Sequence, residues 1–517
     1  MLYWLEETTE RMASKKKFKL KISVTLLAIL LLGLFLRIFK FSEFFQFNHE
    51  QDLQAWIVKD ILINKHPRLI GQETSIVGLF IGSLYYYLLV PFFAIFNFDP
   101  RASIIPITAI SLATIASVYF VLTKLFDKKI GTVGALIYAV SPAIIFLDRW
   151  TVPTVATFFW TIWFFYVVME FLKGKFQTVP ILIILIGLIW HIHIAFVPLL
   201  LLIPIAIYLS KKDWKEGLKK VDKRNLRTSI IIAVILLIPF VAFEFRHNFQ
   251  QVRGLMGANR TREGQARELR RGYYKVEVIA EYMNRVVWSP IFYQKNFKNP
   301  SVIKIPFMLF AYLGLVIFLY KKGKLNKKEM ILILLWMVDV FFGLLFSERI
   351  ISDYYFNNLI IISVVIFSLT FSHFFSQKST KKIAILLLTF FVGFGFWKVV
   401  TKKVSVREFE DREAIVEFIT LDAKKNNYPC VAINYIGNIG IRYGYRYFFW
   451  WKGTDQIIPS NDVPVYSIVQ PASISESEIE FRSGEIGVIL PREPKVPNEQ
   501  VCSDPSKQLL PLNGFVN

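Results

Sequence analysis

The feature that most constrains this chain is a series of long apolar segments separated by short charged stretches. The segments are a run that ends at Phe39 and then, roughly, residues 79–98, 102–126, 130–147, 154–172, 178–209, 228–243, 303–320, 329–346, 356–373 and 382–399. About 20 apolar residues are enough for a helix to cross a bilayer. The composition agrees, because 54% of the 517 residues are hydrophobic and only 19% are charged. We therefore expect a mainly α-helical, polytopic membrane protein and exclude soluble, fibrous and disordered classes.

The charges are strongly basic, with a formal net charge of +22. Most lysines and arginines lie beside apolar segments, where cytoplasmic loops and anionic lipid headgroups explain them, so no nucleic-acid partner is expected. The lysine-rich start, Lys15–Lys21, precedes an apolar run that is too long for a signal peptide. We interpret this run as a retained first span.

The short basic loops predict the topology, because such loops stay in the cytoplasm. They lie at Lys124–Lys129, Lys173–Lys175, Lys211–Arg227, Lys321–Lys328 and Lys378–Lys382. Parity of crossings then allows only one of the segments 79–98 and 102–126 to span. Segment 79–98 contains Gly82, three tyrosines and Pro91 and is the better candidate for lying flat or re-entering at the outer face. Parity also requires 178–209 to cross twice, with a break at His191-Ile192-His193. The prediction is about eleven spans in the plasma membrane, with the N-terminus in the cytoplasm.

Two regions follow from this topology. Residues 1–400 are predicted to form the transmembrane domain, with large outer loops at 41–101 and 244–302. Residues 401–517 are richer in turns and predict a small extracytoplasmic α/β domain, with a helix at 410–425 and strands at Cys430–Ile433 and Glu485–Leu490. Outside the cell a Cys430–Cys502 disulfide is feasible, but two buried thiols are an equal alternative.

Two carboxylates, Glu50 and Asp52, follow the first span directly. A carboxylate in a cleft at the membrane surface can take a proton from an acceptor hydroxyl, and partial burial raises its pKa toward the working range. The alternative is that Asp52 only caps a helix that starts near Leu53 and that Glu50 is solvated.

Further charged groups are predicted on the same outer face. Lys65, His66 and Arg68 precede the tyrosine-rich segment, where cations suit a phosphate at headgroup depth. The turn Asp148-Arg149 adds an acid and a base, for which capping and snorkelling is the alternative. The outer loop and a later turn add Glu244, Arg246, His247, Arg253, Arg260, Arg262, Arg267, Arg270, Arg271 and the stretch Ser347–Tyr355. The i,i+2 spacing of His191 and His193 argues against a metal site.

The order of these features resembles the GT-C superfamily of membrane glycosyltransferases, in particular family 39. The matching features are the first span, the outer acids Glu50 and Asp52, a Gly-Gln-x-Thr-Ser stretch followed by Gly82 and three tyrosines, and an outer acid at Asp148. Protein O-mannosyltransferases and the lipid A aminoarabinose transferase share this plan, and the resemblance covers most of residues 20–400. The family usually has aspartate where this chain has Glu50.

The resemblance implies an inverting transfer of a sugar from a polyprenyl-phosphate carrier to an extracytoplasmic acceptor. Glu50 or Asp52 would be the base, with Asp148 and Arg149 in orienting roles. Lys65, Arg68, Tyr85, Arg246 and His247 would hold the lipid phosphate or donor. Such a displacement needs no nucleotide or redox cofactor; a divalent metal is left open, as are the sugar and the acceptor (protein, lipid or polysaccharide).

A lipid or solute transporter of the cell envelope is the competing interpretation. Transporters place ionisable residues near the bilayer midplane in two related halves. No such halves are detectable here and the acids gather outside the spans, so the sequence favours an enzyme.

Overall fold

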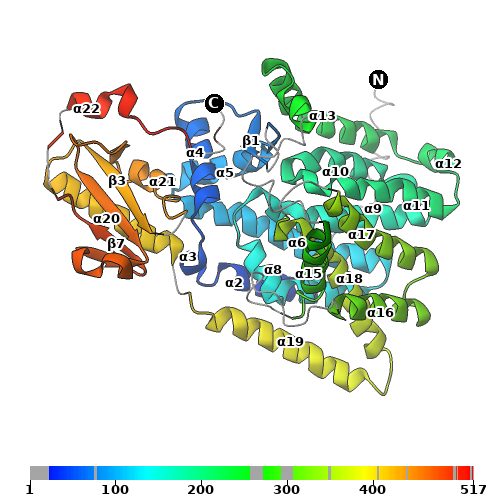
Figure 1. Cartoon of the computed structure of the whole chain (residues 1–517). Helices are drawn as coiled ribbons and strands as arrows, with labels where there is room; N and C mark the ends of the chain where they lie inside the picture. The colour runs from blue at the N-terminus through cyan, green and yellow to red at the C-terminus, as the bar shows by residue number, and fades with distance from the viewer. Residues whose placement is uncertain are drawn as a thin grey trace, which may run out of the picture.

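The computed structural model describes residues 23–74, 78–256, 272–292, 307–346, 351–404, 407–437, 440–492, 496–497, 499–512 and 515. Figure 1 shows a large bundle of helices beside a smaller unit that contains a β-sheet. Three predicted features lie outside the described residues. These are the lysines at 15–21, the arginines at 260–271 and the turn at 347–350.

Apolar helices dominate the bundle. The helices and strands up to residue 210 are α2 (Val24–Ile38), α3 (Phe41–Phe44), α4 (His49–Ile63), β1 (Ile70–Glu73), β2 (Phe80–Gly82), α5 (Leu84–Ile95), α6 (Ile104–Leu125), α7 (Lys128–Val140), α8 (Pro142–Asp148), α9 (Thr157–Leu172), α10 (Val179–Ile192), the 3₁₀ helix η4 (Ile194–Leu201) and α11 (Leu202–Ser210). They continue with α12 (Trp214–Lys219), α13 (Lys223–Arg246), α14 (Gln250–Met256), α15 (Gly272–Val286), α16 (Phe307–Lys321), α17 (Lys327–Leu345), η5 (Asp353–Phe356), α18 (Asn357–Phe375) and α19 (Lys381–Thr401).

Several of these helices can cross a membrane. Within the described ranges, five are long and apolar enough by length and composition: Pro100–Leu125, Pro153–Leu172, Lys223–Arg246, Asp353–Phe375 and Lys381–Thr401. The bent pair α7 and α8 would make a sixth, and further apolar helices are shorter. The mainly α-helical membrane fold is thus confirmed, while the count of about eleven spans stays a prediction.

Two irregular segments have the form that the topology required. Helix α5 contains Pro91 and has only 12 residues, which is too short to cross a bilayer. The apolar run 178–209 breaks at His193, whose backbone is extended and whose Nδ1 accepts a hydrogen bond from the amide of Ala195 at 3.0 Å. The break therefore provides its own cap for the helical turn that follows.

One predicted span is bent. Segment 130–147 bends by 65° between α7 and α8. Ser141 is extended and Pro142 begins α8. Because proline disfavours helical backbone in the residue before it, the helix must end there and restart in a new direction.

The C-terminal unit is an α/β structure. A five-stranded sheet has the order β4 (Asp455–Ile457), β3 (Cys430–Gly437), β5 (Val465–Gln470), β7 (Ile486–Ile489), β6 (Phe481–Ser483). The pairs β3–β4 and β3–β5 are parallel, and β5–β7 and β6–β7 are antiparallel. Helix α20 (Glu408–Lys425) packs on one face, and the short helices α21 (Arg446–Trp451) and α22 (Glu499–Ser503) and the 3₁₀ turns η6 (Ala472–Glu478) and η7 (Pro505–Lys507) lie in the connections. The expected helix and both expected strands are confirmed.

Cys430 and Cys502 form a disulfide, with their Cα atoms 5.8 Å apart. This resolves the alternative that the sequence left open. The bond ties the start of β3 to helix α22.

The helical bundle and the sheet unit share a hydrophobic core. Phe45, Phe47 and Tyr86 belong to the same buried cluster as Phe409 and Phe448. Rings of Phe47 and Phe448 lie 4.6 Å apart. This shared core holds the sheet unit against α3, α4 and α5, as Figure 1 also shows. The domain boundary near residue 400 stays a prediction.

Candidate active site

Helix α4 carries both predicted acids in its first turn. It begins at His49, and the Asn48 side chain caps it while Gln51 returns a hydrogen bond to the Asn48 backbone. The alternative in which Asp52 caps a helix from Leu53 is therefore wrong. Acids in a first helical turn are also favoured by the helix dipole.

Glu50 lies in a half-buried position beside aromatic residues. Tyr85, Tyr86, Tyr354 and Asp353 are all within electrostatic reach of its carboxylate. Burial raises the pKa of Glu50, and the nearby charge of Asp353 raises it further. Within the described ranges the Glu50 carboxylate makes no hydrogen bond or ion pair of its own. A carboxylate with a raised pKa and unused lone pairs is suited to accept a proton.

Asp52 faces a different part of the molecule. Its side chain is 1% exposed and accepts hydrogen bonds from the amides of Gly444 at 3.3 Å and Tyr447 at 3.0 Å. Two residues along a helix correspond to a rotation of about 200°, so the two acids point in nearly opposite directions. Asp52 therefore caps α21 of the C-terminal unit, and this geometry favours Glu50 over Asp52 as the base.

The pKa of Asp52 is raised to about 7. Burial is the main cause and outweighs the two backbone amides and the nearby Arg446 and Arg412, which lower it. A carboxyl whose folded pKa exceeds its unfolded value stabilises the folded state in its protonated form. This contribution is complete below about pH 4 and is lost as the pH rises through about 7.

We expect Asp52→Asn to flatten this pH dependence, because asparagine does not titrate. The measurement is thermal unfolding of the detergent-solubilised protein between pH 4 and 8. The wild type should lose stability across this range more steeply than the variant. Equal slopes in both proteins would contradict the burial of an ionisable group at this contact.

Asp148 is buried with a partner that the sequence analysis missed. Its Oδ2 atom lies 2.6 Å from a guanidinium nitrogen of Arg37 in α2, and its Oδ1 accepts from the Tyr138 hydroxyl at 3.0 Å. Ser111 also donates to this carboxylate. A lone arginine inside an apolar span was the available signal, because such residues are nearly always paired. Asp148 thus joins α2, α6, α7 and α8 rather than facing Glu50.

Arg149 is buried as well and serves the end of α2. Its guanidinium donates to the carbonyls of Leu36 at 2.5 Å, Arg37 at 3.1 Å and Phe39 at 2.8 Å. These are carbonyls that a helix end leaves unsatisfied. The capping alternative therefore fits Arg149. Together, Asp148 and Arg149 position the chain that leads from α2 into α4.

The predicted phosphate-binding cations are not gathered at Glu50 in the described parts of the chain. Lys65 is exposed just beyond the end of α4. Arg68 is buried, pairs with Asp60 at 2.7 Å and lies over the ring of Phe515 at 4.2 Å. Arg246 is exposed at the end of α13, and His247 stacks on Phe243 with ring centroids 4.2 Å apart.

The glycine- and tyrosine-rich motif forms the wall beside Glu50. Tyr85 donates a hydrogen bond to Gln54 of α4 at 2.9 Å, and the Tyr86 hydroxyl accepts one from the amide of Gln72 at 3.2 Å. A Cβ atom at Gly71 would overlap the Tyr86 ring, and one at Gly82 would overlap the His191 ring. The motif therefore needs glycine at both positions to bring the β1–β2 hairpin against the helices.

Gln51 and Gln54 also belong to this region, although sequence reasoning did not select them. Gln51 donates to the carbonyl of Thr151 at 3.3 Å, and Gln54 donates to the Thr151 hydroxyl at 3.4 Å. These contacts fix α4 to the turn that follows Asp148 and Arg149.

An apolar cavity lies beyond the same hairpin. Its volume is about 180 Å³, and it is lined by β2, α10, α13 and α14, including Phe80, Trp190, Leu237, Phe240 and Leu255. Glu244 and Gln251 provide polar groups at this cavity. The hairpin thus contacts the apolar cavity through Phe80 and the Glu50 region through Tyr86.

No group of three or more His, Cys, Asp or Glu side chains is placed to hold a metal in the residues that the structure describes. His191 instead accepts from the amide of Leu84 at 3.3 Å and lies 2.9 Å from the carbonyl of Leu236. His193 therefore caps the helix break, as predicted, whereas His191 is hydrogen-bonded to α5 and α13.

Comparison with known proteins gives a family match and several structural matches. Residues 82–243 match the family model described as dolichyl-phosphate-mannose-protein mannosyltransferase. The fold is similar to that of ArnT from Cupriavidus metallidurans bound to undecaprenyl phosphate, with a TM-score of 0.53, 9% identity, and coverage of 90% of this chain and 96% of that chain. The apo state of the same protein gives a TM-score of 0.52.

An oligosaccharyltransferase from Archaeoglobus fulgidus is also similar, with 12% identity over 87% of this chain and 68% of that one. Its TM-score is 0.47. No curated protein matches the chain in sequence.

Proposed function

We propose that this chain is a GT-C glycosyltransferase that transfers a sugar from a polyprenyl-phosphate carrier to an acceptor hydroxyl outside the cytoplasm. The family match of residues 82–243 and the fold similarity to ArnT support this proposal. The family description and the ArnT structure name a lipid-phosphate sugar and a lipid phosphate, respectively. The observation that carries the proposal is the Glu50 carboxylate. It is half-buried, has a raised pKa, and forms no hydrogen bond or ion pair among the described residues.

The reaction follows from this group. Glu50 takes the proton of the acceptor hydroxyl, whose oxygen forms a bond to the anomeric carbon of the sugar. The bond between that carbon and the phosphate oxygen breaks, and its electron pair leaves with the polyprenyl phosphate. Attack from the face opposite the leaving group inverts the configuration at the anomeric carbon. A base whose pKa lies near the operating pH is the most effective for such a step.

The apolar cavity between the hairpin and α13 is our proposed place for the first isoprene units. Its lining is almost entirely aliphatic and aromatic. His247 and Arg253 follow α13 closely, and Arg253 donates to the His247 carbonyl at 3.3 Å. We place the carrier phosphate at the edge of the hairpin between this cavity and the Glu50 region, with Arg246 and Arg253 as its cations and His247 beside them.

Arg68 is less suited to the phosphate than the sequence predicted, whereas exposed Lys65 stays a candidate. Arg68 is already paired with Asp60, and breaking a buried pair is costly. We assign Arg68 to the support of α4 instead.

Mass spectrometry of lipids that co-purify with the protein tests the donor class directly. A polyprenyl phosphate, with or without one attached sugar, is the expected species. Retention of bulk phospholipid alone, together with tight binding of a nucleotide sugar, would refute the assignment.

The membrane location agrees with the fold and the apolar helices, and we propose that the C-terminal unit lies outside the cytoplasm. The Cys430–Cys502 disulfide supports this side, because disulfides persist in oxidising compartments. The basic loop around α12 is then cytoplasmic.

Single engineered cysteines can test this orientation, because the two native cysteines are already bonded. Leu421→Cys on α20 should react with a membrane-impermeant maleimide in intact cells, since this residue is 61% exposed. Lys215→Cys on α12 should react only after the membrane is permeabilised. Reaction of both sites in intact cells would contradict the topology.

A further inference from the structure

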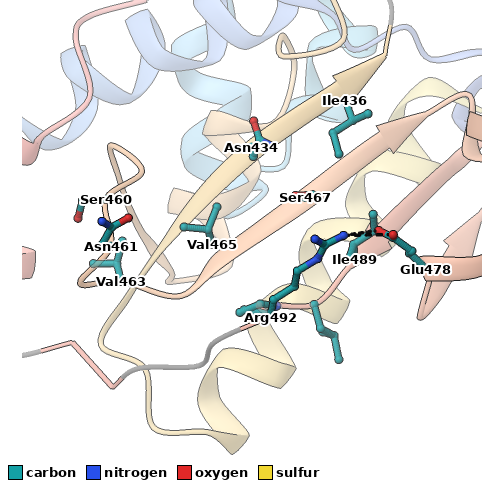
Figure 2. A pocket seen from close by; sticks show the side chains of 12 residues that line it. Asn434, Ile436, Ser460, Asn461, Val463, Val465, Ser467, Glu478, Ile489 and Arg492 are labelled. Carbon is teal, nitrogen blue, oxygen red and sulfur yellow. Dashed lines mark hydrogen bonds and ion pairs between the residues drawn. The ribbon is translucent and has the colours of Figure 1, made fainter. Parts of the chain in front are cut away.

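The face of the C-terminal sheet that points away from α20 is hollowed by a pocket of about 630 Å³ (Figure 2). Alternation along the strands explains its position. Val431 and Ile433 of β3 point into the core with α20, whereas Asn434 and Ile436 line the pocket. The volume falls within the range of about 300–1,000 Å³ that is usual for small-molecule sites.

Neutral polar side chains dominate the polar part of the lining. Asn434 and Ser467 are register partners on the parallel strands β3 and β5, and Ser460 and Asn461 come from the loop before β5. None of these four side chains has a hydrogen-bond partner within the described ranges. Asn434 and Asn461 are exposed at the pocket, whereas the Ser460 hydroxyl oxygen is shielded from solvent. Unused donors and acceptors at one pocket indicate that a ligand can satisfy them.

The charges of the pocket cancel. Figure 2 shows Glu478 and Arg492 at the side opposite Ser460 and Asn461, joined by an ion pair of 3.0 Å. The Arg492 side chain is 80% exposed and that of Glu478 is 48% exposed, so both can also bond a ligand. The remaining lining is aliphatic and includes Val463, Val465 and Ile489. A net-neutral site of amides, hydroxyls and aliphatic carbons does not suit a phosphate or an acidic polymer.

We infer that this pocket binds a neutral saccharide. Sugar hydroxyls both donate and accept hydrogen bonds, as amides and serines do, and the C–H faces of a sugar ring match the aliphatic side chains. The pocket lies on the face of the sheet turned away from α4 and the Glu50 region. It is therefore an anchoring site remote from the reaction. On the basis of the proposed function, its ligand is the glycan part of an extended acceptor.

Saturation-transfer NMR on the full, detergent-solubilised chain tests this inference, with an α-linked mannotriose and a β-linked N-acetylglucosamine tetramer as probes. At least one probe should bind, and Asn434→Ala/Asn461→Ala should weaken it by about tenfold. Ser467→Phe, which fills the pocket, should abolish binding. The matched control Glu417→Ala/Lys424→Ala changes exposed residues of α20 on the other side of the sheet and should bind like the wild type.

Absence of binding by both probes would overturn the inference, as would equal binding by the pocket variants and the wild type. Selective binding of a short peptide in the same pocket would also overturn it. The experiment needs no turnover, so its failure is distinct from a failure of the proposed function. In kinetic assays with a glycan acceptor, the pocket variants should raise the acceptor KM and leave kcat unchanged.

Discussion

Replacing Glu50 with glutamine is expected to lower kcat for sugar transfer by a factor of about 10² to 10⁴, the usual contribution of a general base. Glutamine keeps the size of the side chain but cannot take the acceptor proton. Donor binding should change little, because Glu50 acts on the acceptor hydroxyl, while the carrier phosphate leaves from the opposite face of the sugar. The measurement is initial-rate kinetics with a polyprenyl-phosphate sugar and an acceptor hydroxyl.

The pH profile gives this prediction a second readout. The wild-type rate should rise with pH as Glu50 loses its proton, with a midpoint above the ordinary value for glutamate because burial and Asp353 raise its pKa. The Glu50→Gln variant should not show this rise of the rate with pH. Asp52→Asn is the matched control. It removes the neighbouring carboxylate but should keep the rise of the rate with pH. Full activity in Glu50→Gln would contradict the assignment of the base.

Breaking the buried ion pair between Arg37 and Asp148 should cost about 3–5 kcal/mol of folding stability. Arg37→Met leaves the Asp148 carboxylate without its cation in a site where both side chains are 1% exposed. The same change releases hydrogen bonds to the carbonyls of Gly33 and Ala139. We expect a large fall in the midpoint of thermal unfolding in detergent and a low yield of folded protein.

Two variants control for this experiment. Arg37→Met/Asp148→Leu removes both charges and should recover much of the lost stability, because no charge is then left buried and unpaired. Lys398→Met in α19 removes a cation that lies 5.3 Å from the Trp397 ring and has no ion pair among the described residues. Its effect should stay within about 0.5 kcal/mol. A single Arg37→Met variant as stable as Lys398→Met would refute the role of the pair.

The broad architecture could be predicted because a membrane helix is recognised from its own apolar residues, without knowledge of distant contacts. A run of apolar residues is enough to place a helix such as α18 or α19. The break at His193 was also predictable, since two histidines interrupt an apolar run whose ends must lie on the same side. The bend at Pro142 was missed because proline inside an apolar segment is often tolerated in membranes.

The position of the acids was predictable, but their directions were not. Sequence placed Glu50 and Asp52 just beyond the first span, and the structure puts both in one helical turn. The capping box from Asn48 to Gln51 was a readable signal for the helix start. With that start, the spacing of two residues would have separated the two carboxylates. Only the tertiary structure shows that Asp52 faces α21.

Contacts between distant parts of the chain limited the rest of the prediction. Arg37 and Asp148 are separated by 111 residues, and the local sequence around either residue does not predict a contact with the other. The packing of the sheet unit on α4 and α5 depends likewise on aromatic residues from several regions. The pocket on the open face of the sheet becomes visible only when Asn434, Ser460 and Ser467 are brought together.

The stereochemistry of the product tests the central claim most directly. The purified protein would be supplied with a polyprenyl-phosphate sugar of known anomeric configuration, and the product examined by NMR. Direct attack by a Glu50-activated hydroxyl predicts the opposite configuration and one polyprenyl phosphate released for each sugar transferred. A product with the donor's configuration, or transfer that proceeds only from a nucleotide sugar, would contradict the account.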